Sequence, residues 1–165
     1  MLSRRSIRKL SDKPIPAEQV QTLIEAAMLA PSSRGSRPWE FVVVEERSML
    51  ATLSRCKQSG ATPLEGCKLA VVVCADPMKS GAWIEDCAIA AAYIQLQAHD
   101  LGLASCWVQI RDRVCTEDLG SEEYVSKYLK IDDNLRVECI IALGYPDEER
   151  PSTDPATLPW EKVHI

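Results

Sequence analysis

The sequence has few aromatic residues, few histidines and no long apolar run. Only 5% of its 165 residues are aromatic, one of them a phenylalanine, and two are histidines. No stretch approaches the roughly 18 consecutive apolar residues that a membrane-spanning helix needs. The first thirty residues are too charged, and too interrupted by Pro14 and Pro16, for a secretory signal peptide. These absences predict a cytoplasmic protein with no membrane contact.

Positive charge is also scarce for a nucleic-acid-binding protein. The chain has 19 Lys and Arg residues against 24 Asp and Glu, a net charge of -5 and a pI near 5.1. General nucleic-acid binding needs a broad basic face that displaces phosphate counterions, and no stretch after residue 9 supplies one. The cluster of Arg4, Arg5, Arg8 and Lys9 must therefore serve something local.

Cysteine is plentiful, but no pair has the CxxC spacing of a zinc or redox motif. The seven cysteines are Cys56, Cys67, Cys74, Cys87, Cys106, Cys115 and Cys139. Most stand in apolar runs, and with only His99 and His164 beside them a four-ligand zinc site has little support. We expect no metal and mainly buried, free thiols. A cysteine-dependent redox or metal protein stays open as an alternative, which native thiol titration would distinguish.

The first half of the chain predicts a helix and two strands within one domain covering residues 1–165. Residues 15–30 place apolar side chains on one face of a helix of about 14 residues. The β-branched runs from Phe41 to Val44 and from Leu69 to Cys74 predict buried, central strands. This alternation of helices and strands, taken alone, suggests a doubly wound parallel sheet.

The second half predicts a helix that is apolar on nearly all sides. It runs from Asp86 to Leu101 and ends before Gly102, a residue suited to a left-handed cap. Such a helix lies at the centre of a core or against another subunit. Strands at 103–110 and 136–146 surround a weaker helix at 116–129 that Gly120 interrupts. The proline-containing tail, 147–165, is expected to be irregular and to pack on a partner subunit.

Two stretches contain residues that are typical of ligand-binding sites. In "RRSIR", Arg4 and Arg8 are four residues apart and would share one side of a helical turn, with the Ser6 hydroxyl between them. Guanidinium groups and a hydroxyl suit a phosphate monoester, although a solvated basic terminus would explain the same residues. "LAPSSRGSRPWEFVVV" passes from a helix through turn-forming residues into a strand. Loops of this kind often bind ligands, and an ordinary polar loop is the alternative.

The order of these stretches resembles the nitroreductase family of FMN-dependent flavoproteins. The landmarks are "RRSIR" at 4–8, "APSSRGSRPWEF" at 30–41, "EDCAIAAAYIQLQAHDLGLASCW" at 85–107 and "ALGYP" at 142–146. The resemblance implies an α+β fold with a mainly antiparallel central sheet flanked by helices. It further implies an intertwined homodimer with FMN at the subunit interface, and it overrides the doubly wound parallel sheet.

The resemblance assigns the N-terminal cluster to the phosphate and ribityl end of FMN. The residues at those family positions are Arg4, Arg5, Ser6 and Arg8. The family usually adds a Lys or Arg near the C-terminus, but here the tail offers only Arg150 and Lys162, neither aligned with that position. We therefore expect phosphate binding to depend mainly on Arg4 and Arg8.

The resemblance also assigns residues to the flavin ring. The segment reaching across from the partner subunit is Pro31, Ser32 and Ser33. Arg37 stands where the family often has a glutamine that bonds the isoalloxazine, and its charge would raise the flavin potential. Gln109 and Ile110 are similar in position to residues whose backbone lies near flavin N5, where small glycines are common.

The implied activity is hydride transfer from NADH or NADPH through flavin N5 to a nitroaromatic, quinone or similar electron-poor acceptor. The sequence contains no Ser-His-Asp or Cys-His set, and flavin chemistry needs none. Trp83 is a candidate to stack on substrate, or else a packing residue. Reductive dehalogenation or flavin destruction on the same fold, and a non-catalytic flavin-binding module, are the alternatives.

Overall fold

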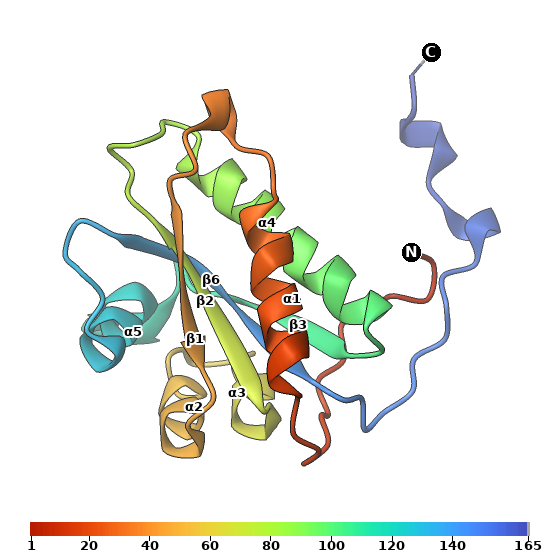
Figure 1. The fold of residues 1–165 in the computed structure, drawn as a ribbon, viewed down its shortest axis with the longest axis horizontal. Helices are drawn as coiled ribbons and strands as arrows, with labels where there is room; N and C mark the ends of the chain where they lie inside the picture. Colours follow the sequence, from red (N-terminus) through yellow and green to blue (C-terminus); the bar gives the residue numbers. More distant parts are fainter. Residues whose placement is uncertain (165) are drawn as a thin grey trace.

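An antiparallel sheet of four strands lies at the centre of the structure (Figure 1), a computed structural model that describes residues 1–164. The strand order is β1 (Trp39–Val44), β2 (Leu69–Ala75), β6 (Arg136–Gly144) and β3 (Ala104–Gln109). β2 and β3 run in the same direction, but β6 lies between them and pairs antiparallel with both. The predicted α+β class is confirmed, and the doubly wound parallel sheet suggested by alternation alone is wrong.

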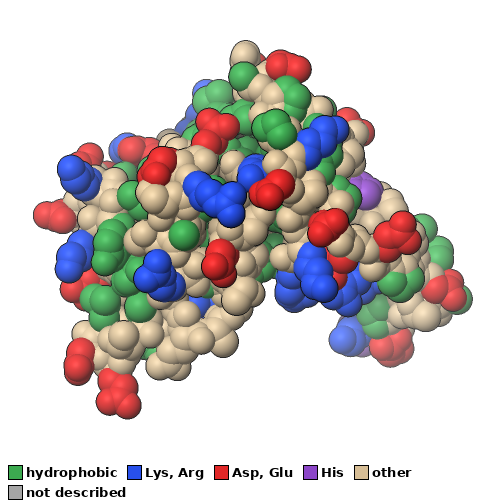
Figure 2. Space-filling model, turned by 90° about the horizontal axis from the view of Figure 1, so that it is seen from below, with side chains coloured by type: hydrophobic (Ala, Val, Ile, Leu, Met, Phe, Trp, Pro, Cys, Tyr) green, Lys and Arg blue, Asp and Glu red, His purple; other side chains and the backbone are tan. Residues whose placement is uncertain are grey.

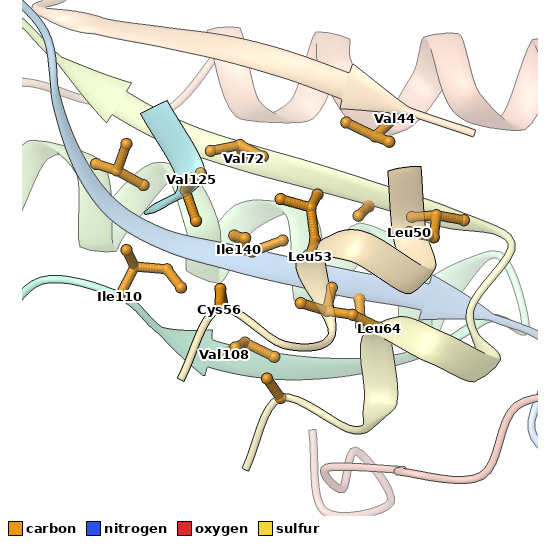
Figure 3. Close-up of a cluster of buried hydrophobic side chains, with 14 of the residues drawn as sticks. Val44, Leu50, Leu53, Cys56, Leu64, Val72, Val108, Ile110, Val125 and Ile140 are labelled. Carbon is orange, nitrogen blue, oxygen red and sulfur yellow. The ribbon is translucent and has the colours of Figure 1, made fainter. Parts of the chain in front are cut away.

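Helices cover both faces of the sheet. α1 (Ala17–Met28) and α4 (Trp83–Asp100) lie on one face. α2 (Arg47–Leu53), α3 (Pro63–Gly66) and α5 (Ser121–Leu129) lie on the other, where Figure 3 shows their apolar side chains meeting those of the strands. Side chains alternate between the two faces of a strand, and every residue of β2 is buried because both faces are covered.

The structure differs from the sequence expectation at β1 and at the helix expected over residues 116–129. β1 was expected to be central, but it is an edge strand whose residues are mostly half-buried or exposed. The helix expected at 116–129 begins only at Ser121, and Gly120 precedes it as its N-cap. Residues before it form a short hairpin of β4 (Val114–Thr116) and β5 (Leu119–Gly120). Glycine is a poor helix former, which agrees with a helix that begins only after Gly120.

The helix expected from Asp86 begins three residues earlier and is only partly enclosed by its own chain. Trp83 is its first residue, and Gly102 follows its end with φ of +73°, as predicted for a left-handed cap. Ile89, Tyr93 and Leu96 form a stripe on α4 that is 37–39% exposed. No helix within residues 1–164 is long and apolar enough to span a membrane.

The C-terminal tail extends away from the rest of the chain (Figure 1). Its described part, residues 147–164, contains two short 3-10 turns, η2 (Pro155–Thr157) and η3 (Trp160–Lys162), and is otherwise irregular, as its prolines predict. Trp160 is 68% exposed and Val163 54%, so the tail presents apolar side chains that its own chain leaves uncovered.

Candidate functional site

The N-terminal arginine cluster lies on a non-helical segment held between β3 and the tail. The Ile7 amide donates to the Ser105 carbonyl at 3.1 Å, and Ser6 forms a parallel bridge with Ser105. On the other side, the Asp147 amide donates to the Lys9 carbonyl at 2.9 Å. The expected helical turn is therefore wrong, because pairing with β3 extends the segment.

The structure brings only part of the predicted phosphate-binding cluster to one cavity. Arg4 and Arg5 line a cavity that the buried Ile7 also lines, whereas Ser6 and Arg8 are not among its lining residues. Within residues 1–164 the guanidinium groups of Arg4 and Arg8 make no hydrogen bond or ion pair. The Arg5 side chain donates to the Pro151 carbonyl, so it also holds the tail.

The tail adds a cation that the sequence did not align with this cluster. Glu148 accepts hydrogen bonds from the backbone N–H groups of Arg8 and Lys9 at 2.6 and 3.2 Å, and these hold the pKa of its carboxyl below its usual value. The same carboxylate accepts from Arg150 at 3.0 Å. Arg150 thereby lines a cavity of about 320 Å³ together with Arg4. Figure 2 shows Lys and Arg side chains gathered where the tail leaves the body of the molecule.

The serine-rich loop is fixed to the start of α4. Asp86, which is 2% exposed, accepts a hydrogen bond from the Ser33 amide at 2.7 Å. The Arg37 amide donates to the Ser32 hydroxyl at 2.9 Å. Arg37 has a φ of +46°, and its guanidinium has no partner within residues 1–164. Pro31 is exposed beside these serines, so the loop presents its predicted ring-binding residues to solvent.

The two predicted cofactor-binding groups lie at opposite ends of α4. His99, near the end of the helix, contacts Ser3 at 2.9 Å and lines the same cavity as Arg4. Asp86, near its start, holds Ser33. At 1.5 Å per residue, the 13 residues from Asp86 to His99 span about 20 Å of helix. The structure therefore does not bring the arginines and the serines of one chain together.

The predicted residues at the end of β3 have internal partners. The Gln109 side chain accepts from Trp107 Nε1 at 2.8 Å and donates to the buried Glu138 carboxylate at 3.1 Å. Ile110 is fully buried, and its N–H donates to the Glu138 carbonyl at 3.2 Å. These contacts fix the strand end, and the role of its backbone toward flavin N5 stays a prediction.

Lys57 was not among the residues predicted from the sequence, and it reaches the end of β3 from the segment after α2. Its ammonium donates to the Gln109 carbonyl at 3.2 Å, and burial lowers its pKa. The residue lies 52 positions from its partner and outside any motif, so no local signal could have marked it. Trp83, the predicted substrate-stacking residue, is half-buried at the start of α4.

The cysteines form no candidate site. Six of the seven are buried, and Cys115 is half-buried. Burial raises the pKa of Cys56 and of Cys67 to about 11 and that of Cys74 to about 12. Within residues 1–164, no group of three or more potential metal ligands is close enough to hold an ion.

We therefore expect one of the seven thiols, Cys115, to react quickly with a thiol reagent in the native protein. The other six should react only after unfolding, because a buried, protonated thiol is a poor nucleophile. Titration in buffer and in denaturant, with a Cys115→Ser variant as control, measures both classes. Several fast thiols in that variant would instead favour the cysteine-dependent redox or metal protein.

A family model and solved structures of known proteins match most of this chain. The family model described as "Nitroreductase family" matches residues 1–65 and 69–145. A solved structure of an FMN-dependent nitroreductase from Clostridium difficile R20291 is 45% identical. It has a TM-score of 0.97 and aligns with 98% of this chain and 94% of its own.

Two curated relatives are also similar over most of their length. A protein of Archaeoglobus fulgidus, provisionally named an NADH dehydrogenase/NAD(P)H nitroreductase, is 38% identical over 152 residues, which are 90% of this chain and 84% of its own. An iodotyrosine deiodinase of Thermotoga neapolitana is 25% identical over 163 residues, covering 90% of this chain and 87% of its own.

Proposed function

Because this chain belongs to the nitroreductase family, we propose that it is an oxidoreductase that transfers a hydride from NADH or NADPH to a small electron-poor acceptor. The acceptor would be a nitroaromatic compound, a quinone or a similar molecule, and bound FMN would supply the hydride-transfer chemistry. The support comes from the family, from the FMN dependence of the Clostridium difficile nitroreductase, and from the cationic and hydroxyl groups of this chain.

The N-terminal cluster fits the phosphate end of FMN. Arg4 and Arg8 offer guanidinium groups without protein partners in residues 1–164, and the hydroxyl of Ser6, between them in the sequence, would be a further donor. The segment is fixed by its bridge to Ser105 and by Glu148, so little order would be lost on binding. Arg150 supplies the additional C-terminal cation that the family usually has.

The observation that carries the proposal is the separation of the two cofactor-binding groups along α4. Because the arginines and the serine loop lie near opposite ends of α4, with about 20 Å of helix between Asp86 and His99, the arginines of one subunit would be completed by Pro31, Ser32 and Ser33 of a second. The exposed stripe on α4 and the apolar side chains of the tail are uncovered surfaces of the kind that a homodimer buries.

We assign to Arg37 the role of tuning the reduction potential of the flavin. Its backbone is held by Ser32, and its guanidinium is free to meet the ring of the bound cofactor. A fixed positive charge favours negative charge on an adjacent group, so Arg37 would stabilise the reduced form and raise the reduction potential. Trp83 would cover the substrate side.

A second candidate is reductive dehalogenation, for which the likeness to the Thermotoga neapolitana deiodinase is the specific observation. It requires the same bound FMN and differs in the acceptor. A nitroaromatic compound, a quinone and an iodinated phenol, offered separately to the reduced protein, would rank the two candidates by rate of flavin reoxidation.

The first test is the visible spectrum of the protein after incubation with FMN and desalting. We expect retained flavin bands that bleach when NADH or NADPH is added without air and return when an acceptor is added. Retained bands that bleach with dithionite but with neither nicotinamide would indicate a non-catalytic flavin-binding module. Loss of all flavin on desalting would contradict the cofactor assignment.

A further inference from the structure

A cavity at the start of α4 carries positive charge that the proposed function leaves unused. It has a volume of about 330 Å³ and is formed by the 33–36 turn and the loop that leads into the helix. These two segments lie side by side at the top of Figure 1. Its lining residues, all within the described part of the chain, are Ser33, Arg34, Ser36, Lys79, Ser80, Gly81 and Ala82. None of them is acidic.

The walls of this cavity are fixed from beneath by one buried carboxylate. Asp86 accepts hydrogen bonds from the Ser33 amide at 2.7 Å and from the Ser80 hydroxyl at 2.9 Å, so it joins the turn to the loop. The Ser80 hydroxyl in turn accepts from the Ala82 amide at 3.2 Å. A cavity whose two sides share such a connection is preorganised, which lowers the entropy lost on binding.

The turn is held in an unfavourable conformation. Arg34 has a φ of +53° and Arg37 a φ of +46°, in the left-handed region that non-glycine residues rarely adopt. The Ser36 hydroxyl oxygen is buried and has no hydrogen-bond partner within residues 1–164. Strained backbone and an unpaired buried hydroxyl each destabilise the free protein and are typical of sites where a ligand binds.

The two cations remain available to a ligand. Arg34 is exposed and makes no ion pair within residues 1–164. Lys79 lies 3.5 Å from Glu40, and both side chains are about half exposed, so this pair is weak and easily replaced. A guanidinium, an ammonium and serine hydroxyls together suit the oxygens of a phosphate group.

We propose that this cavity binds a phosphate of the nicotinamide dinucleotide that reduces the protein. This inference rests on the proposed function, which assigns the FMN phosphate to Arg4 and Arg8 and the flavin ring to Pro31–Ser33. The cavity is lined by Ser33 but by neither Pro31 nor Ser32, so we assign it to the dinucleotide and not to the flavin. Arg34 and Lys79 are then binding residues for the reductant.

The test compares Lys79→Ala and Arg34→Asn with Lys127→Ala, an exposed cation on α5 that contacts neither site. Asparagine suits position 34 because it tolerates a positive φ. Calorimetry on the oxidised, flavin-loaded protein gives its affinity for NADP⁺ and NAD⁺. The concentration dependence of anaerobic flavin bleaching gives the Kd of NADPH and NADH and the limiting rate.

We expect each cavity variant to weaken dinucleotide binding by about 10-fold or more, with the limiting bleaching rate within about twofold of the unaltered protein. Lys79→Arg should keep the affinity. Weakening for NADP⁺ and NADPH alone assigns the cavity to the 2′-phosphate, and equal weakening for all four dinucleotides assigns it to the pyrophosphate.

Affinities of Lys79→Ala and Arg34→Asn that match those of Lys127→Ala in both measurements would overturn the inference. This outcome differs from failure of the proposed function. In that case the unaltered protein would retain no flavin or would not be reduced by either nicotinamide, whereas here flavin is retained and reduced in every variant.

Discussion

Replacing Arg4 or Arg8 with alanine is expected to weaken FMN binding by roughly 10- to 160-fold in each case. The estimate follows from a loss of about 1.5–3 kcal/mol for each charged hydrogen-bond partner removed. Neither guanidinium has a protein partner within residues 1–164, so the substitutions should leave the fold intact. Quenching of flavin fluorescence on titration measures the affinity, and circular dichroism checks the fold.

Riboflavin provides the control for this experiment, because it lacks the phosphate. Its affinity should be nearly the same in the unaltered protein and in both arginine variants, and Lys127→Ala should bind FMN normally. Equal losses of riboflavin and FMN affinity would mean that the arginines act through the fold. Unchanged FMN affinity in both variants would contradict the phosphate assignment.

Combining two variants that do not bind FMN in one dimer is expected to restore FMN binding at about half of the sites of the mixed dimers. One variant is Arg4→Ala with Arg8→Ala. The other is Ser33→Trp, which adds bulk at an exposed residue of the proposed ring-binding loop. If each site takes its arginines from one subunit and its loop from the other, a mixed dimer has one site with both lesions and one with neither.

The measurement uses two affinity tags, so that mixed dimers can be purified after joint expression and their bound flavin counted per dimer. Each variant alone should retain almost none. If arginines and loop of the same subunit formed the site, every site in the mixed dimer would carry one lesion and no flavin would be regained. A protein that elutes as a monomer would contradict the dimeric arrangement.

Local patterns in the sequence determined most of the elements. The run from Leu69 to Cys74 predicted a buried, central strand, and β2 is fully buried and lies inside the sheet. The glycine at 102 predicted the end of α4, and its φ is positive. The prolines of the tail predicted an irregular segment. Each of these features depends on neighbours in the sequence, so a local pattern is sufficient to find it.

The family landmarks also predicted the α+β class, whereas periodicity alone wrongly suggested a doubly wound parallel sheet. Periodicity could not place β6 between β2 and β3, because strand order depends on contacts between segments about 30 to 70 residues apart. The wrong expectation that β1 is a central strand has the same cause. A β-branched run looks the same in the sequence whether its strand lies at the edge or at the centre of a sheet.

Only the tertiary structure decided where the charged groups meet. It placed Arg150 beside Arg4, paired the segment around Ser6 with β3 instead of coiling it, and brought Lys79 to the turn that contains Arg34. It also separated the arginines from the serine loop by the length of α4. The sequence by itself therefore determined which residues are available for chemistry. Which of them share a site followed from chain packing, because contacts between distant residues leave no periodic signal in the sequence.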